Sequence, residues 1–137
     1  MTSPDELART LTSIAAALDS LGVRWAIGGS LASAAYGEPR ATNGIDLIAA
    51  LDGASARKLC GLLGADFYAD PDVAQEAVRA RSSFNVIDQR SFLKVDIFVP
   101  DKGPLGLGQL DRREIIEVLS GTPSLPVLAA EDVVLQK

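Results

Sequence analysis

One stretch of the chain, Trp25–Leu51, constrains the fold more strongly than any other. It begins within Val23–Ile27, a short apolar run rich in β-branched and aromatic residues, which is typical of a buried strand. Gly28 and Gly29 follow at once, and glycine adopts turn conformations that are closed to residues with a side chain. Ser30 is then placed to cap a short helix. A turn of this kind presents backbone N–H groups and a hydroxyl at a helix N-terminus, where a phosphate can bind.

A second strand follows this helix and carries a single carboxylate. The helix is expected over Leu31–Tyr36, and Gly37 ends it. After a loop, Ile45–Leu51 has the composition of a buried strand, with Asp46 near its start. A lone carboxylate in an apolar strand is costly unless it is paired or solvated. Asp46 therefore either binds a metal ion or makes a structural contact, as a hydrogen bond to the glycine turn or an ion pair with Arg40.

Two further β-rich runs, Phe84–Asp88 and Phe92–Val99, predict an antiparallel hairpin, because only three residues separate them. Aliphatic residues alternate along the second run, which places Asp96 on the face turned away from the helices. Asp96 can then lie beside Asp46 if the two strands are neighbours. The expected structural partner of Asp96 is Lys94.

Together these residues resemble the minimal nucleotidyltransferases of the DNA polymerase β-like superfamily, and most closely the bacterial abortive-infection and toxin–antitoxin branch. The matching segments are Gly28-Gly29-Ser30, Gly37, Arg40-x-Thr42-x-Gly44-Ile45-Asp46-Leu47 and Lys94-Val95-Asp96-Ile97-Phe98. The resemblance covers about residues 5–137. It implies one nucleotidyltransferase-like domain over residues 1–137, of the α+β (α/β) class, with a mixed β-sheet and helices packed on one face.

In that family the Gly-Ser turn holds the phosphates of the nucleotide, and three aspartates bind Mg²⁺ for nucleotidyl transfer. The resemblance therefore implies Mg²⁺ as cofactor and a nucleoside triphosphate as substrate or ligand. The implied catalytic and metal-binding residues are Asp46 and Asp96. The implied nucleotide-binding residues are Gly28, Gly29, Ser30, Arg40 and Thr42. Arg40 either clamps a triphosphate or locks the loop to Asp46, and Thr42 is also expected to position the strand as a turn residue.

One position departs from the family pattern. Where the family has the first aspartate of its D-x-D motif, this chain has Gly44. Residues 44 and 46 point to the same side of a strand, so an aspartate at 44 would share a metal ion with Asp46. Asn43 cannot substitute, because a shift of one residue turns a side chain to the opposite face, and Asp52 lies roughly 20 Å further along. We therefore expect nucleotide binding with weak or absent transfer, since loss of an electrostatic catalytic group typically costs on the order of 10²–10³ in rate.

The composition limits the chemistry that the chain can use. It has no histidine and a single cysteine, Cys60, which excludes imidazole acid–base catalysis, cysteine zinc sites and an internal disulfide. The net charge is −5 and the pI about 4.6, so a nucleic-acid partner would need a local basic patch. The candidates for such a patch are Arg79, Arg81, Arg90, Arg112 and Arg113. No apolar run is of membrane-spanning length and the N-terminus lacks a signal sequence, so a cytoplasmic protein without a membrane partner is expected.

Helical patterns precede and follow the central stretch. Leucine and isoleucine recur at helical spacing between Pro4 and Gly22, which predicts an amphipathic helix. Asp52 is expected to cap a second helix, over Ala54–Leu63, that Gly64 ends. The leucines expected to point inward from that helix are Leu59, Leu62 and Leu63. A third helix is expected over Asp72–Arg81, preceded by Asp70-Pro71.

The C-terminal third gives weaker patterns. Asp101–Gly108 is rich in glycine and proline, which predicts a loop. Arg113–Leu119 fits either a helix turn or a buried strand, and the resemblance favours a strand paired with Leu125–Leu128. Glu131–Lys137 has the pattern of a helix start. Family members continue through further helices here, so that the helical extension is expected to be absent or cut short in this chain.

Two functional hypotheses of different classes follow. The first is a nucleotidyltransferase-like protein that binds Mg²⁺-nucleotide and transfers a nucleotidyl group to a hydroxyl acceptor weakly or not at all. The second is a non-catalytic regulatory or interaction module, such as one component of a toxin–antitoxin pair, that binds a protein partner or a second copy of itself. The hydrophobic content of 47% supports the second, because exposed apolar surface marks interfaces.

Overall fold

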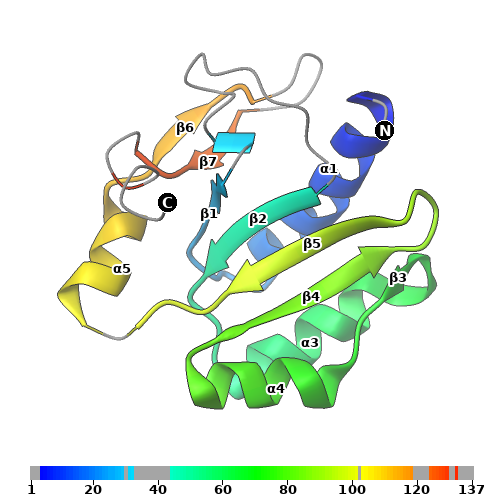
Figure 1. Cartoon of the computed structure of the whole chain (residues 1–137), viewed down its shortest axis with the longest axis horizontal. Helices are drawn as coiled ribbons and strands as arrows, with labels where there is room; N and C mark the ends of the chain where they lie inside the picture. The colour runs from blue at the N-terminus through cyan, green and yellow to red at the C-terminus, as the bar shows by residue number, and fades with distance from the viewer. Residues whose placement is uncertain are drawn as a thin grey trace.

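A seven-stranded mixed sheet forms the centre of the protein (Figure 1). The computed structural model describes residues 4–29, 31–32, 44–101, 103–118, 124–129 and 132. Within these residues the strand order is β3-β4-β5-β2-β1-β7-β6. The strands are β1 (Trp25–Gly28), β2 (Gly44–Ala49), β3 (Phe67–Tyr68), β4 (Ser83–Asp88), β5 (Leu93–Phe98), β6 (Glu114–Ile116) and β7 (Leu125–Val127). The helices are α1 (Pro4–Ser20), α3 (Gly53–Leu63), α4 (Pro71–Ala80) and α5 (Pro104–Asp111), with a 3₁₀ turn at Gly64–Asp66.

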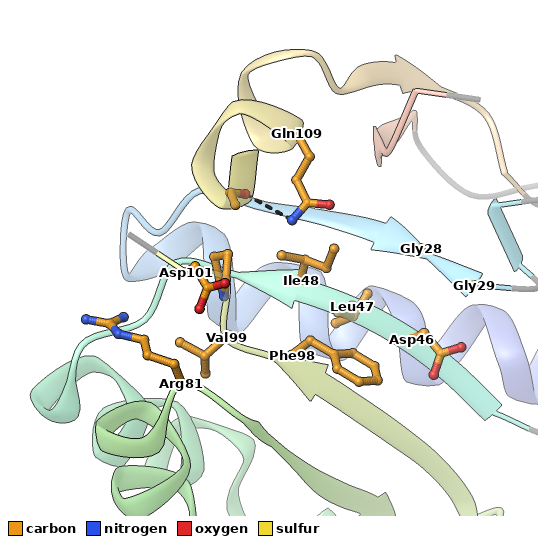
Figure 2. Close-up of a pocket in the computed structure, with 12 residues that line it drawn as sticks. Gly28, Gly29, Asp46, Leu47, Ile48, Arg81, Phe98, Val99, Asp101 and Gln109 are labelled. Atoms are coloured by element: carbon orange, nitrogen blue, oxygen red, sulfur yellow. Dashed lines mark hydrogen bonds between the residues drawn. The ribbon is translucent and has the colours of Figure 1, made fainter. Parts of the chain in front are cut away.

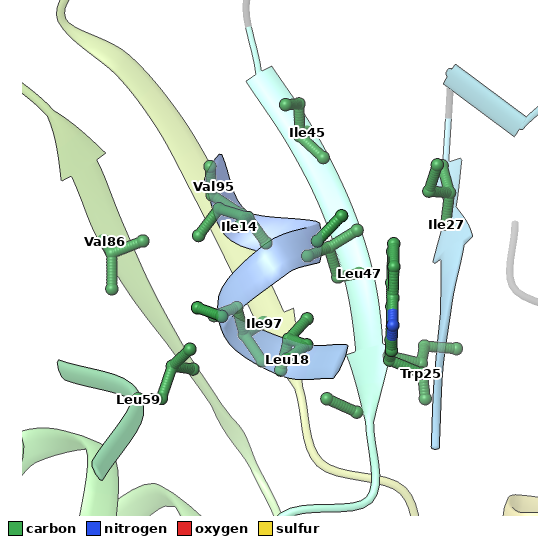
Figure 3. Packing of buried hydrophobic residues seen from close by; sticks show 14 of the residues in the cluster. Ile14, Leu18, Trp25, Ile27, Ile45, Leu47, Leu59, Val86, Val95 and Ile97 are labelled. Atoms are coloured by element: carbon green, nitrogen blue, oxygen red, sulfur yellow. The ribbon is translucent and has the colours of Figure 1, made fainter. Parts of the chain in front are cut away.

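Helices α1 and α3 lie behind the sheet as it is drawn in Figure 1, and α4 lies beside α3 below β4. The predicted apolar stripe of α1 is confirmed, because Leu11, Ile14 and Leu18 are fully buried. Figure 3 shows Ile14 and Leu18 beside the inner strands of the sheet. The expected fold class, a mixed sheet with helices on one face, is therefore correct.

The central strands β2 and β5 are parallel neighbours, and β1 pairs with β2 in the antiparallel sense. Because side chains alternate across a strand, β2 and β5 each divide into two sets. The set that faces the helices is buried to 1% exposure or less and consists of Ile45, Leu47, Val95 and Ile97. The opposite set, Gly44, Asp46, Lys94 and Asp96, lies on the face that these helices leave uncovered.

The predicted cap of α3 is present, and α4 is capped as well. Asp52 forms a reciprocal capping box with Ser55, and Asp70 accepts hydrogen bonds from the first turn of α4. Gly64 ends α3 with a φ of 66°. The prediction that Leu62 points inward is wrong, because it is 54% exposed. The buried stripe of α3 runs through Ala56, Leu59, Cys60 and Leu63, and position 62 lies on the flank of that stripe.

The predicted loop over Asp101–Gly108 is wrong, because α5 begins at Pro104. Proline is suited to the first turn of a helix, so it marks a helix start here. The glycine at 106 has a packing reason, since a Cβ there would lie 2.8 Å from the backbone nitrogen of Asp101. The glycine and proline that suggested a loop therefore allow a helix to pack closely on the preceding chain.

The segment that fitted either a helix turn or a strand is a strand. Residues Glu114–Ile116 form β6 and pair antiparallel with β7, as the family resemblance favoured. Of the helix expected over Glu131–Lys137, only Asp132 lies within the described residues, where it is buried and paired with Arg112. Among the described helices, none has the length and apolar character needed to cross a bilayer.

Candidate functional site

Asp46 and Asp96 occupy the same level of neighbouring parallel strands. They are register partners across β2 and β5, and Gly28 of β1 is the register partner of Asp46 on its other side. Both aspartates are partly buried and belong to the strand face turned away from the aliphatic core. The expectation that the two carboxylates lie side by side is therefore confirmed.

The environment of Asp46 disfavours its ionised form. Burial raises the pKa of Asp46, and the neighbouring Asp96 raises it further by charge repulsion and by a hydrogen bond between the two carboxyl groups. The positive charge of Lys94 acts in the opposite direction on the same pKa. The ammonium of Lys94 lies 3.9 Å from the Asp96 carboxylate, as expected for its structural partner. The positive charge of Lys94 thus only partly offsets the repulsion between the two carboxylates. A bound cation would reduce that repulsion further.

The turn after β1 fits closely against Asp46. Gly29 has a φ of 62°, in the left-handed region that favours glycine. A Cβ at this position would lie 2.8 Å from Cγ of Asp46 and would overlap its carboxylate. Asp46 therefore packs directly on the predicted tight turn. Of the other predicted nucleotide-binding residues, Ser30, Arg40 and Thr42 lie outside the described residues.

Gly44 lies two residues before Asp46 on the same face of β2, opposite Lys94 of β5. A Cβ at this position would lie 3.0 Å from the carbonyl oxygen of Lys94, so a side chain needs a small backbone shift. Asp52, the alternative carboxylate, is used as the cap of α3. Among the described residues, no group of three or more histidine, cysteine, aspartate or glutamate side chains is placed to hold a metal ion. The aspartates thus form a pair in the described structure.

The donor set fits one kind of metal site. Carboxylate oxygens are ligands for hard divalent cations, and Mg²⁺ is commonly held by one or two carboxylates together with substrate phosphates. Asp46 and Asp96 provide two such carboxylates, and the single positive charge of Lys94 does not neutralise both. The pair therefore suits an ion that is shared with a phosphate ligand better than an ion enclosed by protein alone.

A cleft of about 410 Å³ opens beside this pair (Figure 2). Its lining comes from the end of β1 and the following turn, from β2, from the end of β5, and from α5. Figure 2 shows Asp46 at one end of the cleft and Arg81 and Asp101 at the other, with Phe98 between them. The volume lies within the range of small-molecule sites.

Among the cleft residues that the sequence did not single out as site residues are Ile48, Phe98, Asp101 and Gln109. Strand alternation gives an indication for Phe98, because it lies two residues beyond Asp96 on the same face. Asp101 and Gln109 carry no such indication, since the first was assigned to a loop and the second to no element. Their place in the cleft depends on how α5 packs.

The arginines proposed as a basic patch are largely engaged by other parts of the chain. Arg79 pairs with Glu76, Arg90 with Asp88 and Arg112 with Asp132. Arg113 donates a hydrogen bond to the carbonyl of Leu110. Arg81 differs from these four, because it lines the cleft and makes no ion pair within the described residues.

Comparisons with known proteins identify the fold. No protein-family profile matches the chain, and no curated protein sequence matches it. A solved structure of a candidate nucleotidyltransferase from Thermotoga maritima superposes with a TM-score of 0.63 and 20% identity, over 99% of this chain and 84% of that one. A solved tRNA-processing enzyme, crystallised in an apo form, is similar with a TM-score of 0.52 and 14% identity, over 98% of this chain and 35% of that one. The chain has a nucleotidyltransferase-like fold.

Proposed function

We propose that the protein binds a Mg²⁺-nucleoside triphosphate at Asp46 and its register partner Asp96, at the end of the cleft that Gly28, Gly29 and Asp46 line. Nucleotidyl transfer from this site to a hydroxyl acceptor is weak or absent, because Gly44 supplies no carboxylate. The observation that carries the proposal is the register pairing of Asp46 with Asp96, directly beside the tight turn at Gly29.

The roles of the residues follow from their positions. Asp46 and Asp96 would hold Mg²⁺, which when bound neutralises the charge of the triphosphate and of the departing pyrophosphate. Backbone N–H groups of the turn after β1 would bind phosphate oxygens. In the transfer itself, an acceptor oxygen forms a bond to the α-phosphorus, the bond to pyrophosphate breaks, and the hydroxyl proton is released. The fold similarity supports this reaction class through the architecture of the sheet alone.

The experiment is calorimetric titration of Mg²⁺-ATP and Mg²⁺-GTP into the natural chain, Gly44→Asp and Gly44→Ala. We expect all three proteins to bind nucleotide and Gly44→Asp to bind at least about tenfold more tightly, because a third carboxylate strengthens metal binding. Gly44→Ala is the matched control, since it adds the same Cβ 3.0 Å from the Lys94 carbonyl without a carboxylate. Its affinity should remain that of the natural chain.

A second readout is release of pyrophosphate in the presence of hydroxyl acceptors, where Gly44→Asp should exceed both other proteins on the order of 10²-fold. Absence of nucleotide binding by all three proteins, with an unchanged circular dichroism spectrum, would overturn the proposal. That outcome would favour the alternative of a non-catalytic interaction module.

A further inference from the structure

The cleft continues beyond the aspartate pair. Asp46 lines one end, and Arg81, Asp101 and Gln109 line the other (Figure 2). Phe98 lies two residues beyond Asp96 on the same face of β5, or roughly 7 Å along the strand. This distance is about the length of one ribose. A nucleotide whose phosphates are held at the aspartate pair would therefore place its base over Phe98.

Phe98 offers a platform for a planar group. Its side chain is 44% exposed, although it belongs to a central strand, and the aliphatic side chains of Ile48 and Val99 flank it in the cleft lining. Aromatic side chains that remain open to a cavity bind nucleobases by stacking, and stacking alone does not distinguish one base from another. The choice of base must come from polar groups at the rim.

Two opposite charges are present at that rim. Arg81 is partly buried and Asp101 is exposed, and neither side chain makes a hydrogen bond or an ion pair within the described chain. Most other described arginines have partners, so Arg81 is unusual in keeping its donors available. Arg81 also holds a left-handed backbone conformation, with φ 52°, at the C-terminal end of α4.

The position of Asp101 is fixed by close packing. Gly106 of α5 approaches the backbone of Asp101 so closely that any Cβ at 106 would overlap it. The start of α5 therefore packs directly against the backbone of Asp101. This contact fixes the backbone of Asp101 against α5 and so defines one wall of the rim.

Resting on the proposed function, we infer that this second end of the cleft binds the base of the nucleotide and selects guanine. Guanine carries two neighbouring donors, N1–H and N2–H₂, that match both oxygens of one carboxylate such as Asp101. Its O6 and N7 acceptors match the guanidinium fork of Arg81. Adenine, cytosine and uracil each lack the pair of neighbouring donors and leave one carboxylate oxygen unmatched.

The experiment measures the affinity of Mg²⁺-GTP, Mg²⁺-ATP and Mg²⁺-xanthosine triphosphate for the natural chain, Asp101→Asn and Arg81→Asn. Xanthine replaces the N2 amino group of guanine by an oxygen, so an amide at 101 suits it and a carboxylate does not. We expect the natural chain to prefer GTP over ATP by at least about tenfold. Asp101→Asn should lower the affinity for GTP by about 10- to 100-fold and raise the affinity for xanthosine triphosphate.

Arg81→Asn should lower the affinity for GTP and the affinity for xanthosine triphosphate by the same factor, because both bases present O6 and N7. Asparagine tolerates the left-handed conformation at 81, so a loss of affinity reports the missing guanidinium. Asp72→Asn is the matched control for Asp101→Asn, since it removes the same negative charge at a position on α4 outside this cleft. Its nucleotide preference should equal that of the natural chain.

Equal affinity of the natural chain for GTP and ATP, or an unchanged preference in Asp101→Asn, would overturn guanine selection and leave nucleotide binding in place. Titration of guanosine without Mg²⁺ separates the two proposals. Binding of guanosine that depends on Asp101, without tighter binding of Mg²⁺-GTP, would support the base site and overturn the phosphate site. Absence of binding by every nucleotide and by guanosine would overturn both.

Discussion

The hydroxyl of Thr10 donates a 2.6 Å hydrogen bond to the carboxylate of Asp88, and both side chains have no solvent-exposed area. This contact joins α1 to β4 across the core. The guanidinium of Arg90 donates two further hydrogen bonds of 2.9 Å to the same carboxylate. Burial alone would raise the pKa of Asp88, but the hydrogen bonds from Arg90 and Thr10 outweigh it and lower the pKa from 3.8 to about 2.

The Asp88 network predicts a pH dependence of stability. The folded-state pKa lies below the unfolded value of 3.8, so the ionised carboxylate stabilises the fold above about pH 4. This contribution, about 2 kcal/mol, is lost as the pH falls from about 4 to about 2. Asp88→Asn should therefore lower the free energy of unfolding by about 2–3 kcal/mol at pH 7, and by about half as much near pH 3. Urea unfolding of both proteins across this range measures the difference.

Asp72→Asn is the control for that experiment, because it alters an exposed ion pair with Arg57. It should change the free energy of unfolding by less than about 0.5 kcal/mol at pH 7. A deficit of Asp88→Asn that stays constant from pH 7 to pH 3 would contradict the role of the ionised network.

The contact between Gly29 and Asp46 predicts that Gly29→Ala impairs binding as well as stability. The added methyl group would displace the Asp46 carboxyl, so Mg²⁺-nucleotide affinity should fall at least about tenfold and stability by about 1–3 kcal/mol. Gly22→Ala is the matched control, since Gly22 has a similar φ of 68° and a Cβ there meets nothing within 4 Å. The control should cost about 1–2 kcal/mol and leave the affinity unchanged. Equal affinities in both variants would show that the contact with Asp46 is unimportant for binding.

Gly61 and Gly106, each inside a helix, predict opposite effects of the same substitution. Gly61→Ala in α3 should raise the free energy of unfolding by about 0.5–1 kcal/mol, because alanine favours the helix and its Cβ meets nothing within 4 Å. Gly106→Ala in α5 should lower it by about 1–3 kcal/mol, because the Cβ overlaps the backbone of Asp101. Thermal unfolding compares the two. A stabilising effect of both substitutions would mean that α5 does not pack on Asp101 as described.

The repulsion between Asp46 and Asp96 predicts that these carboxylates lower the stability of the apoprotein and at the same time allow it to bind a metal ion. Asp46→Asn removes one of two neighbouring carboxylates, so the apoprotein should unfold at a higher temperature than the natural chain. Added Mg²⁺ at ten times its dissociation constant should stabilise the natural chain by about 1.4 kcal/mol and the variant far less. Thermal unfolding with and without MgCl₂ measures both effects. An equal gain from Mg²⁺ in both proteins would place the ion elsewhere.

The sequence was most informative about features that depend on residues close together in the chain. The alternation around Asp96 and the glycine turn before Asp46 predicted that both aspartates lie on the sheet face turned away from the helices. The structure confirms this prediction. The cap at Asp52 was also predictable, because capping depends on residues a few positions apart. These features are local, so the chain near each residue is sufficient to specify them.

The features that were missed depend on contacts between distant segments. Thr10 and Asp88 are 78 residues apart, and no local pattern pairs them. The rim of the cleft joins Arg81, at the end of α4, to Asp101, before α5. The glycine at 106 favoured a loop, although its role is to allow a close helix contact that exists only in the folded domain. Leu62 was placed inward because its hydrophobicity outweighed its position on the flank of α3.

The alternation of side chains along β2 and β5 has a consequence for how such a domain can evolve. The residues that attach the sheet to the helices, among them Ile45 and Val95, are a different set from Gly44, Asp46 and Asp96. Loss or recovery of a carboxylate at position 44 therefore leaves the hydrophobic core unchanged. A lineage could therefore lose or gain a carboxylate at this position by one substitution, while the domain folds in the same way throughout.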